Sequence, residues 1–215
     1  MKKILAVGPV VDIKMGAWDY TGPVDKGGRP HGYGTKSCDT EGYDGGWHHG
    51  LRHGLGEHWT RTDSGYCSVK GTWNLGQIKS DVEYQIFIGD VCQLTYKGGW
   101  EGDLFAGLPH GQGQMCRIQG VKYEGEFVHG KKQGTGEMLY SNGTIYKGSF
   151  LNNLPHGNGV IKAEDGRNFS GLFSYGKPNK TGVHPSRPES PRGCELRPGF
   201  ESALRGSSVF NQSRL

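Results

Sequence analysis

The sequence predicts an all-β protein: an elongated single-layer antiparallel sheet of tandem β-hairpins, followed by a disordered tail. Three observations support this fold class. Short motifs recur every 23 residues, polar and apolar residues alternate within each motif, and turn-forming dipeptides separate the motifs. Glycine accounts for 39 of 215 residues and hydrophobic residues for 33%, so a thick two-layer core is not expected.

The repeat is clearest in the second half of the chain. The stretch YEGEFVHGKKQGTG from Tyr123 recurs 23 residues later as YKGSFLNNLPHGNG from Tyr146, with glycines in the same register. Seven repeats can be aligned on an aromatic or apolar first residue, which we number position 0. They begin at Tyr20, Tyr43, Val69, Trp100, Tyr123, Tyr146 and Phe169.

Each part of a repeat has a predicted structure. Alternation places Tyr123, Gly125 and Phe127 on one side of a first strand, where the glycine leaves room for the rings and the facing backbone. The segment GKKQG at 130–134 is expected to be the connecting loop, with a return strand from about position 12 to position 18. Asn142-Gly143 and the later Asp-Gly pair at 165–166 supply hairpin turns.

One part of the array is irregular. The step from Val69 to Trp100 is 31 residues, and residues 77–99 hold the apolar run EYQIFIGDVCQLTY. Gly89-Asp90 is predicted to be a hairpin turn there. Either an extra hairpin or a lengthened one explains the longer step.

The predicted organisation is an N-terminal lead-in at 1–16, the repeat array at 17–183, and a disordered basic tail at 184–215. The tail is rich in Pro, Ser and Arg and has no periodicity. The net charge of +4 originates in the C-terminal segment, because acidic and basic residues balance in the array. No concentrated basic patch is visible, so nucleic acid is not an expected partner.

The glycine spacing resembles that of a nucleotide site, because Gly125 and Gly130-Lys131 approximate a phosphate-binding loop. The same spacing recurs in most repeats, however, and no helix is predicted nearby. The glycines are therefore expected to be architectural. No nucleophile and base form a recognisable arrangement, so we expect no catalytic residues, no cofactor and no enzymatic activity.

Five scattered cysteines, none in a C-x-x-C pair, indicate reduced thiols and a cytoplasmic protein. The N-terminal MKKILAVGPVVD imitates a signal peptide, but its apolar run is short and contains Gly-Pro. No segment approaches the ~20 apolar residues of a membrane-spanning helix.

Histidines precede a repeat glycine at four equivalent positions. Adjacent copies should lie ~10 Å apart, which is too far to share one metal ion, so a role in packing the loops is expected. A second group of histidines (48, 49 and 53) has no accompanying cysteine or carboxylate in the sequence, and no metal site is expected there either. The four equivalent positions are His31, His53, His110 and His156.

The partner-binding candidates are the aromatic residues that follow the repeat. Most should pack between neighbouring hairpins, but in a single-layer sheet one side should stay partly open to a partner. Lys131 and Lys132 form the longest basic run of the array and are the lipid-binding candidates. The aromatic candidates are Tyr20, Tyr43, Trp47, Trp73, Trp100, Tyr123, Phe127, Tyr146, Phe150, Phe169 and Phe173.

The pattern Y-x-G-x-[WF]-x-x-G-x-x-x-G-x-G, present at Tyr43 and Tyr123, resembles the MORN (membrane occupation and recognition nexus) repeats over about residues 18–182. The resemblance implies a grooved hairpin sheet without catalytic residues, acting as a scaffold in cytoskeletal, ciliary or membrane-apposed assemblies. A protein partner is expected, and a homodimer through the terminal repeats is a second expectation. Two alternatives remain open: a peripheral module for anionic phospholipid, and a regulatory subunit of a separate enzyme.

Overall fold

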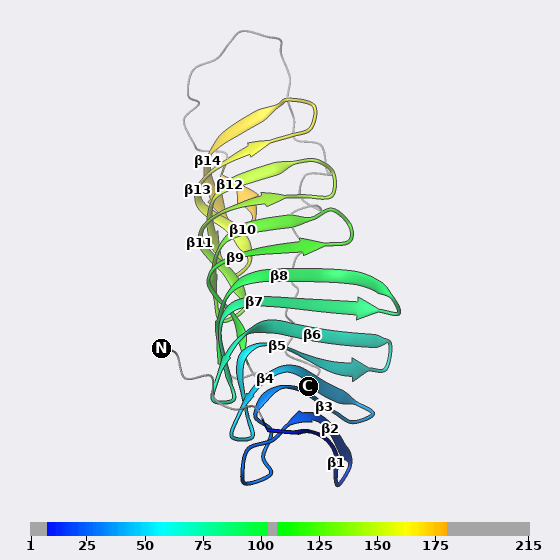
Figure 1. Ribbon diagram of the computed structural model, residues 1–215. Coiled ribbons are helices and arrows are strands. Elements are labelled where there is room, and N and C mark those ends of the chain that lie inside the picture. The colour runs from blue at the N-terminus through cyan, green and yellow to red at the C-terminus, as the bar shows by residue number, and fades with distance from the viewer. Residues whose placement is uncertain (1–7, 103–106, 180–215) are drawn as a thin grey trace, which may run out of the picture. The chain divides into compact units, whose positions relative to one another are not determined.

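The computed structural model describes residues 8–102 and 107–179, and these residues form strands and turns with no helix (Figure 1). The chain divides into two compact units, which meet in the sequence between Gly107 and Leu108. The strands of unit 1 are β1 (Val10–Met15), β2 (Trp18–Pro23), β3 (Gly32–Ser37), β4 (Glu41–His48), β5 (Leu51–Thr62), β6 (Gly65–Asn74), β7 (Gln77–Ile88) and β8 (Val91–Glu101). Those of unit 2 are β9 (Leu108–Arg117), β10 (Lys122–Val128), β11 (Lys131–Leu139), β12 (Ile145–Leu151), β13 (Leu154–Lys162), β14 (Asn168–Ser174) and β15 (Lys177–Pro178).

Within each unit every strand pairs antiparallel with the next strand in the chain. The predicted fold class, an all-β open antiparallel sheet of tandem hairpins, is confirmed. The expected lead-in contains β1, which pairs with β2 and places Asp12 opposite Thr21. The predicted tail lies outside the described residues. No described segment is a helix long and apolar enough to cross a membrane.

In the five repeats that begin at Tyr43, Val69, Tyr123, Tyr146 and Phe169, the hairpin turn is shorter than expected. In the repeat at Tyr123 it consists of His129 and Gly130 alone, with φ of 46° and 75°. Positive φ at both central residues is the geometry of a two-residue type I′ turn, which matches the twist of paired strands. The prediction of a loop at 130–134 is therefore wrong, because β11 already begins at Lys131. The Asn-Gly turn between repeats is confirmed, with Gly143 at φ 75°.

The glycines at positions 2 and 13 have the predicted role of making room for a ring. Gly125 pairs with Gly136 across β10 and β11, and the Tyr123 ring lies beside both. A Cβ built on Gly136 would be 2.6 Å from the Tyr123 hydroxyl oxygen and 2.7 Å from a ring carbon. The hydroxyl donates a 2.9 Å hydrogen bond to the carbonyl oxygen of Glu126. Glycine is needed here for space.

The core of each unit is a row of rings contributed by the first strands of successive repeats. In unit 2 the Tyr146 ring meets Phe150 and Phe173 edge to face, with centroids 5.1 and 5.0 Å apart. In unit 1 the Tyr43 ring meets Trp47 and Trp73 in the same way, at 5.1 and 5.3 Å. Edge-to-face contact is the favourable geometry for aromatic pairs. The rings thus provide the core that one hairpin lacks.

The fourth repeat begins at a different residue from the one predicted. Tyr96, which is fully buried, donates a 2.6 Å hydrogen bond to the carbonyl oxygen of Gly99, three residues ahead, as the other position-0 tyrosines do. It also lies directly opposite Tyr84. Tyr96 therefore occupies position 0 of β8, and Trp100 occupies position 4. Trp100 lies 23 residues before Tyr123, whereas Tyr96 lies further away. Counting by the repeat period therefore selected Trp100, the wrong ring of β8, as the first residue of this repeat.

The irregular segment at 77–99 is a lengthened hairpin, not an extra one. Tyr84 and Tyr96, which face each other, are twelve positions apart, whereas Met138 and Tyr146 are eight apart at the equivalent place. The extra residues extend β7 and β8 to 12 and 11 residues. The predicted Gly89-Asp90 turn is confirmed, because it connects these two strands.

Candidate functional site

The aromatic candidates lie inside the sheet's core. Nine of them are exposed by 7% or less, and they pack edge to face on one another. The other two, Trp100 and Phe169, are half-buried. The expected open side of the aromatic stripe is thus closed at nine positions, because the rings of successive repeats cover one another. The nine are Tyr20, Tyr43, Trp47, Trp73, Tyr123, Phe127, Tyr146, Phe150 and Phe173.

The two lysines proposed to bind lipid separate onto different faces. Lys131 is exposed, whereas Lys132 is 3% exposed and its Nζ lies 5.3 Å from the centroid of the Tyr123 ring. The same Nζ is 3.4 Å from the sulfur of Met138. Burial, with a smaller contribution from Arg117, lowers the pKa of Lys132 to about 8. Because its side chain is buried, Lys132 cannot present its charge to a membrane surface. Of the predicted basic pair, only Lys131 is exposed.

An arginine has the equivalent place in unit 1. The Arg52 guanidinium carbon lies 5.3 Å from the ring centroids of both Tyr43 and Trp73. Arg52 pairs with Trp47 across β4 and β5, as Lys132 pairs with Phe127 across β10 and β11. A cation over an aromatic face is attractive, and the long side chain also covers the ring. These cations thus belong to the core.

The opposite face of unit 1 carries a row of charged side chains. Consecutive members of this row pair directly across β4 to β8, and the Lys97 Nζ lies 3.1 Å from Glu83. Asp44 also accepts a 2.8 Å hydrogen bond from the Thr35 hydroxyl. At ~4.8 Å per strand the row extends for about 19 Å. We call it the outer row; it consists of Asp44, Glu57, Lys70, Glu83 and Lys97.

Two large apolar side chains are exposed next to the outer row. Tyr33 is 65% exposed and its hydroxyl lies 3.1 Å from the Asp44 carboxylate. Leu55 is 72% exposed and lies opposite Thr72 on the neighbouring strand. Exposed apolar groups beside fixed charges are suited to a protein partner, which can bury the former and pair the latter.

Two of the four repeat histidines, His31 and His156, have the expected role in packing loops. His31 Nδ1 accepts a 3.4 Å hydrogen bond from the backbone N–H of His49, a residue of the next repeat's turn. His156 Nδ1 accepts an equivalent 3.4 Å bond from the Tyr175 N–H. Where the repeat has glutamine, the Gln133 side-chain oxygen accepts a 3.1 Å bond from the Asn152 N–H. The position therefore needs only a hydrogen-bond acceptor.

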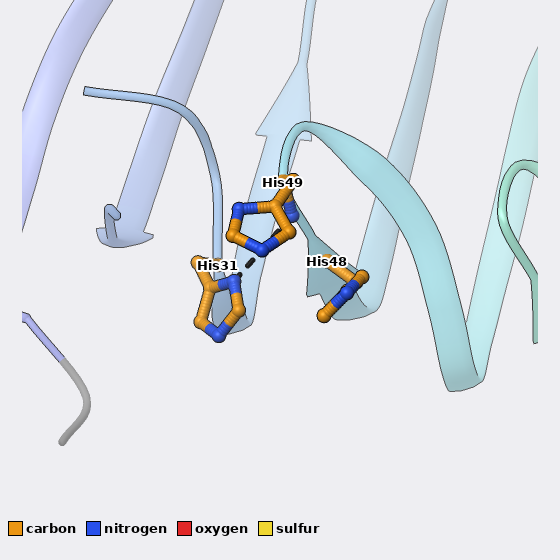
Figure 2. Close-up of side chains that lie close together, drawn as sticks. All are labelled: His31, His48 and His49. Atoms are coloured by element: carbon orange, nitrogen blue, oxygen red, sulfur yellow. Dashed lines mark hydrogen bonds between the residues drawn. The ribbon is translucent and has the colours of Figure 1, made fainter. Parts of the chain in front are cut away.

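At the first of these turns the histidines form a cluster that sequence spacing did not reveal. His48 and His49, at the end of β4 and in the turn after it, lie beside His31 of the preceding repeat (Figure 2). Ligand nitrogens from the three rings lie within 4.8 Å of one another. His53 is next to this cluster, with its ring centroid 5.3 Å from that of His48.

A carboxylate accompanies the cluster, contrary to expectation. Asp25 Oδ2 lies 2.6 Å from His49 Nδ1 and 2.9 Å from Arg29 Nη2. Asp25 also accepts backbone hydrogen bonds from Gly27 and Arg29, which fix the loop before β3. The hydrogen bond with His49, and to a smaller extent that from the Arg29 N–H, keeps the pKa of Asp25 well below its usual range. The prediction of no carboxylate near these histidines is wrong, because a loop 24 residues earlier in the chain supplies one.

Part of this arrangement could have been found in the sequence. His31 and His49 occupy the same template positions as Gln133 and Asn152, which make the equivalent contact, so alignment of the repeats pairs them. The contact of Asp25 depends on the irregular loop before β3, where one residue is inserted into the repeat, and no template position indicates it.

Comparison with known proteins agrees with this architecture. A search of curated proteins found no match. The family model described as MORN repeat matches residues 26–41, 43–61, 100–120, 123–145 and 146–166. Three of these stretches begin at the position-0 tyrosines Tyr43, Tyr123 and Tyr146, and a fourth begins at Trp100 on β8. The chain therefore belongs to the MORN-repeat family.

Proposed function

We propose that this chain is a non-enzymatic scaffold that binds a protein partner through the outer row of unit 1 and the exposed side chains beside it. MORN repeats are known as scaffold or lipid-binding repeats, which agrees with an adaptor role. The observation that carries the proposal is the division of the sheet into two faces. The rings are used in packing the core, whereas the outer row remains accessible.

The chemistry of this face favours a protein over a lipid surface. The outer row contains three carboxylates and two lysines, so its charge is mixed and does not attract an anionic membrane. Tyr33 and Leu55 add apolar contact area, and tyrosine is among the residues enriched at protein interfaces. A partner with a complementary row of charges, spaced at the ~4.8 Å interval of the strands, fits this face.

The perturbed titratable groups also support a role without catalysis. The raised pKa values of Tyr43 and Tyr123 and the lowered pKa of Lys132 result mainly from burial against core rings. These groups lie against the rings of the core, so their shifts record packing. A role as regulatory subunit of a separate enzyme is one form of the same adaptor function.

The setting that we propose is cytoplasmic, in a cytoskeletal, ciliary or membrane-apposed assembly, as the family suggests. Homodimerisation is a further proposal, because β15, the last strand among the described residues, has only two residues, and no other described strand pairs with the rest of β14 on that side. Membrane association would then be indirect, through the partner.

The proposal is tested by cross-linked affinity capture from the cells of origin, followed by binding measurements with the purified partner. Leu55→Ala and Lys70→Glu are both on the proposed surface, and exposed substitutions of this kind change stability by about 0.5 kcal/mol or less. Val91→Ala is the matched control, because Val91 is also exposed but lies at the β7–β8 turn. We expect each surface variant to weaken binding at least tenfold and the control to leave it unchanged.

Equal binding by all the variants would show that the partner uses another surface. Sedimentation of the full chain with phosphatidylserine-containing and neutral vesicles tests the lipid alternative. We expect no binding at physiological salt. Binding to anionic vesicles that survives this salt concentration would contradict the proposal and favour the phospholipid-binding function.

A further inference from the structure

We propose that His31, His48 and His49 form a binding site for a divalent transition metal of the zinc class, with Asp25 as the carboxylate that orients His49. This inference is independent of partner binding. It concerns the turn between β4 and β5, where residues of two repeats bring three imidazoles together (Figure 2).

The distances between the rings suit a shared ion. The centroid of the His31 ring lies 5.1 Å from that of His48 and 4.9 Å from that of His49, and the last two are 4.4 Å apart. Their ligand nitrogens lie within 4.8 Å of one another. Nitrogens bound to one tetrahedral Zn²⁺ at 2.0–2.1 Å stand about 3.3 Å apart, so modest ring rotations would complete the site. The His49 side chain is 49% exposed, so a metal ion in solution can reach it.

The hydrogen bonds place lone pairs where a metal needs them. Asp25 Oδ2, 2.6 Å from His49 Nδ1, can accept a hydrogen bond from the N–H of that nitrogen, which in the neutral ring leaves the lone pair on Nε2. This is the carboxylate–histidine–metal arrangement of many zinc sites, in which the carboxylate fixes the tautomer. Arg29 Nη2 is 3.3 Å from the same His49 nitrogen, but it also binds Asp25, so the Asp25–Arg29 pair adds no net charge.

The imidazole of His31 also has an unprotonated nitrogen directed at the cluster. His31 Nδ1 accepts the 3.4 Å bond from the His49 N–H, so this nitrogen is unprotonated and faces the cluster. The bond is long, and a metal ion can replace it at small cost.

Turn packing alone does not account for this cluster. The equivalent turn at His156 makes the same Nδ1 contact with a single histidine, beside the Tyr175 ring at 5.0 Å. At the turn of Asn152, the side-chain oxygen of Gln133 accepts the equivalent hydrogen bond. The first turn thus has two imidazoles, and a carboxylate, beyond what the repeat requires.

The repeat itself supplies substitutions that remove ligands without disturbing the turn. His31→Gln copies Gln133 and retains an acceptor for the turn N–H. His49→Asn copies Asn152, whose φ of 50° equals that of His49. His156→Gln is the matched control, because it makes the same change at a turn without the cluster. Circular dichroism and thermal unfolding confirm that each variant remains folded.

The experiment is calorimetric titration of the full chain, without a histidine tag and after chelator treatment, with ZnCl₂. Co²⁺ absorption spectra then report the ligand type. We expect one Zn²⁺ per chain and a Co²⁺ spectrum of nitrogen ligation. His31→Gln and His49→Asn should weaken binding at least tenfold, and His156→Gln not at all. Asp25→Asn should weaken it by about 10- to 100-fold, as for other carboxylates that orient a metal-binding histidine.

Two results would overturn the proposal. Folded His31→Gln and His49→Asn variants that bind Zn²⁺ like the wild type would show that the cluster is turn packing only. A thiolate-to-Co²⁺ charge-transfer band would place the metal on cysteines instead, since Cys38, Cys67, Cys92 and Cys116 are free thiols.

Discussion

Replacing Lys132 by methionine should stabilise the protein at neutral pH. The lysine is 3% exposed, and its ammonium lies over the Tyr123 ring and against the sulfur of Met138. Burial lowers its pKa from 10.5 to about 8. A shift of about 2.5 units corresponds to roughly 3 kcal/mol by which the folded state disfavours the charged form. Methionine keeps the long apolar stem and removes this cost.

The cation–π attraction to Tyr123 is lost in the variant and offsets part of the gain, by about 0.5–2 kcal/mol. We therefore expect the free energy of unfolding at pH 7 to rise by about 1–3 kcal/mol in Lys132→Met. The measurement is urea denaturation of both proteins, and Lys131→Met is the control, because its side chain is exposed and should change little.

The pH dependence gives a second test of the same reasoning. Between pH 8 and 10.5 the unfolded chain binds the Lys132 proton and the folded chain does not, so wild-type stability rises with pH in this window relative to the variant. The advantage of Lys132→Met should thus be complete below pH 8 and disappear by about pH 10.5. A variant that is destabilised at pH 7, or a difference that does not change with pH, would refute the argument from burial.

Three further predictions concern the repeat core. Gly136→Ala should cost about 1–3 kcal/mol in urea denaturation, because its Cβ would lie 2.6 Å from the Tyr123 hydroxyl; unchanged stability would contradict the packing argument. Tyr146→Phe should cost about 1 kcal/mol by the same assay, since it removes the 2.8 Å bond to the Ser149 carbonyl, and a stabilised variant would contradict this. Burial lowers the pKa of His58 to about 4, so the folded chain resists protonation that the unfolded chain accepts below its usual pKa of 6.5. Wild-type stability should fall between pH 6.5 and pH 4, and His58→Met, which introduces the residue found at this position in the repeat of Tyr123, should flatten that decline; parallel curves would refute it.

The repeat period and the choice of residues at its fixed positions could be predicted from the sequence. Alternation identified the strands, because side chains of a strand point to opposite faces in turn. The glycine at position 2 could be explained in advance, since a ring on either side of it needs space. The turn inside the repeat was misplaced by the same reasoning. GKKQG has the composition of a loop, whereas the actual turn uses His129 and Gly130 with positive φ at both.

Two findings depended on pairing between strands: Lys131 and Lys132 lie on opposite faces of the sheet, and Tyr96 occupies position 0 of its repeat. Lys131 and Lys132 are alike in sequence, but adjacent residues in a strand face opposite sides, and only the register across β10 and β11 sets Lys132 over a ring. Tyr96 is recognised by its place opposite Tyr84. A 23-residue count could not find it, because extra residues lie between it and the next repeat.

The sequence by itself determined the family, the all-β class and the absence of a recognisable catalytic motif, because these rest on residue types at fixed spacings. The tertiary structure decided which face of the sheet is open. Rings from successive repeats bury one another once the strands are in register, and this leaves the outer row as the accessible surface. It also decided the surroundings of the histidines. Asp25 reaches His49 only because an irregular loop folds back beside the following turn, a contact that no local pattern encodes.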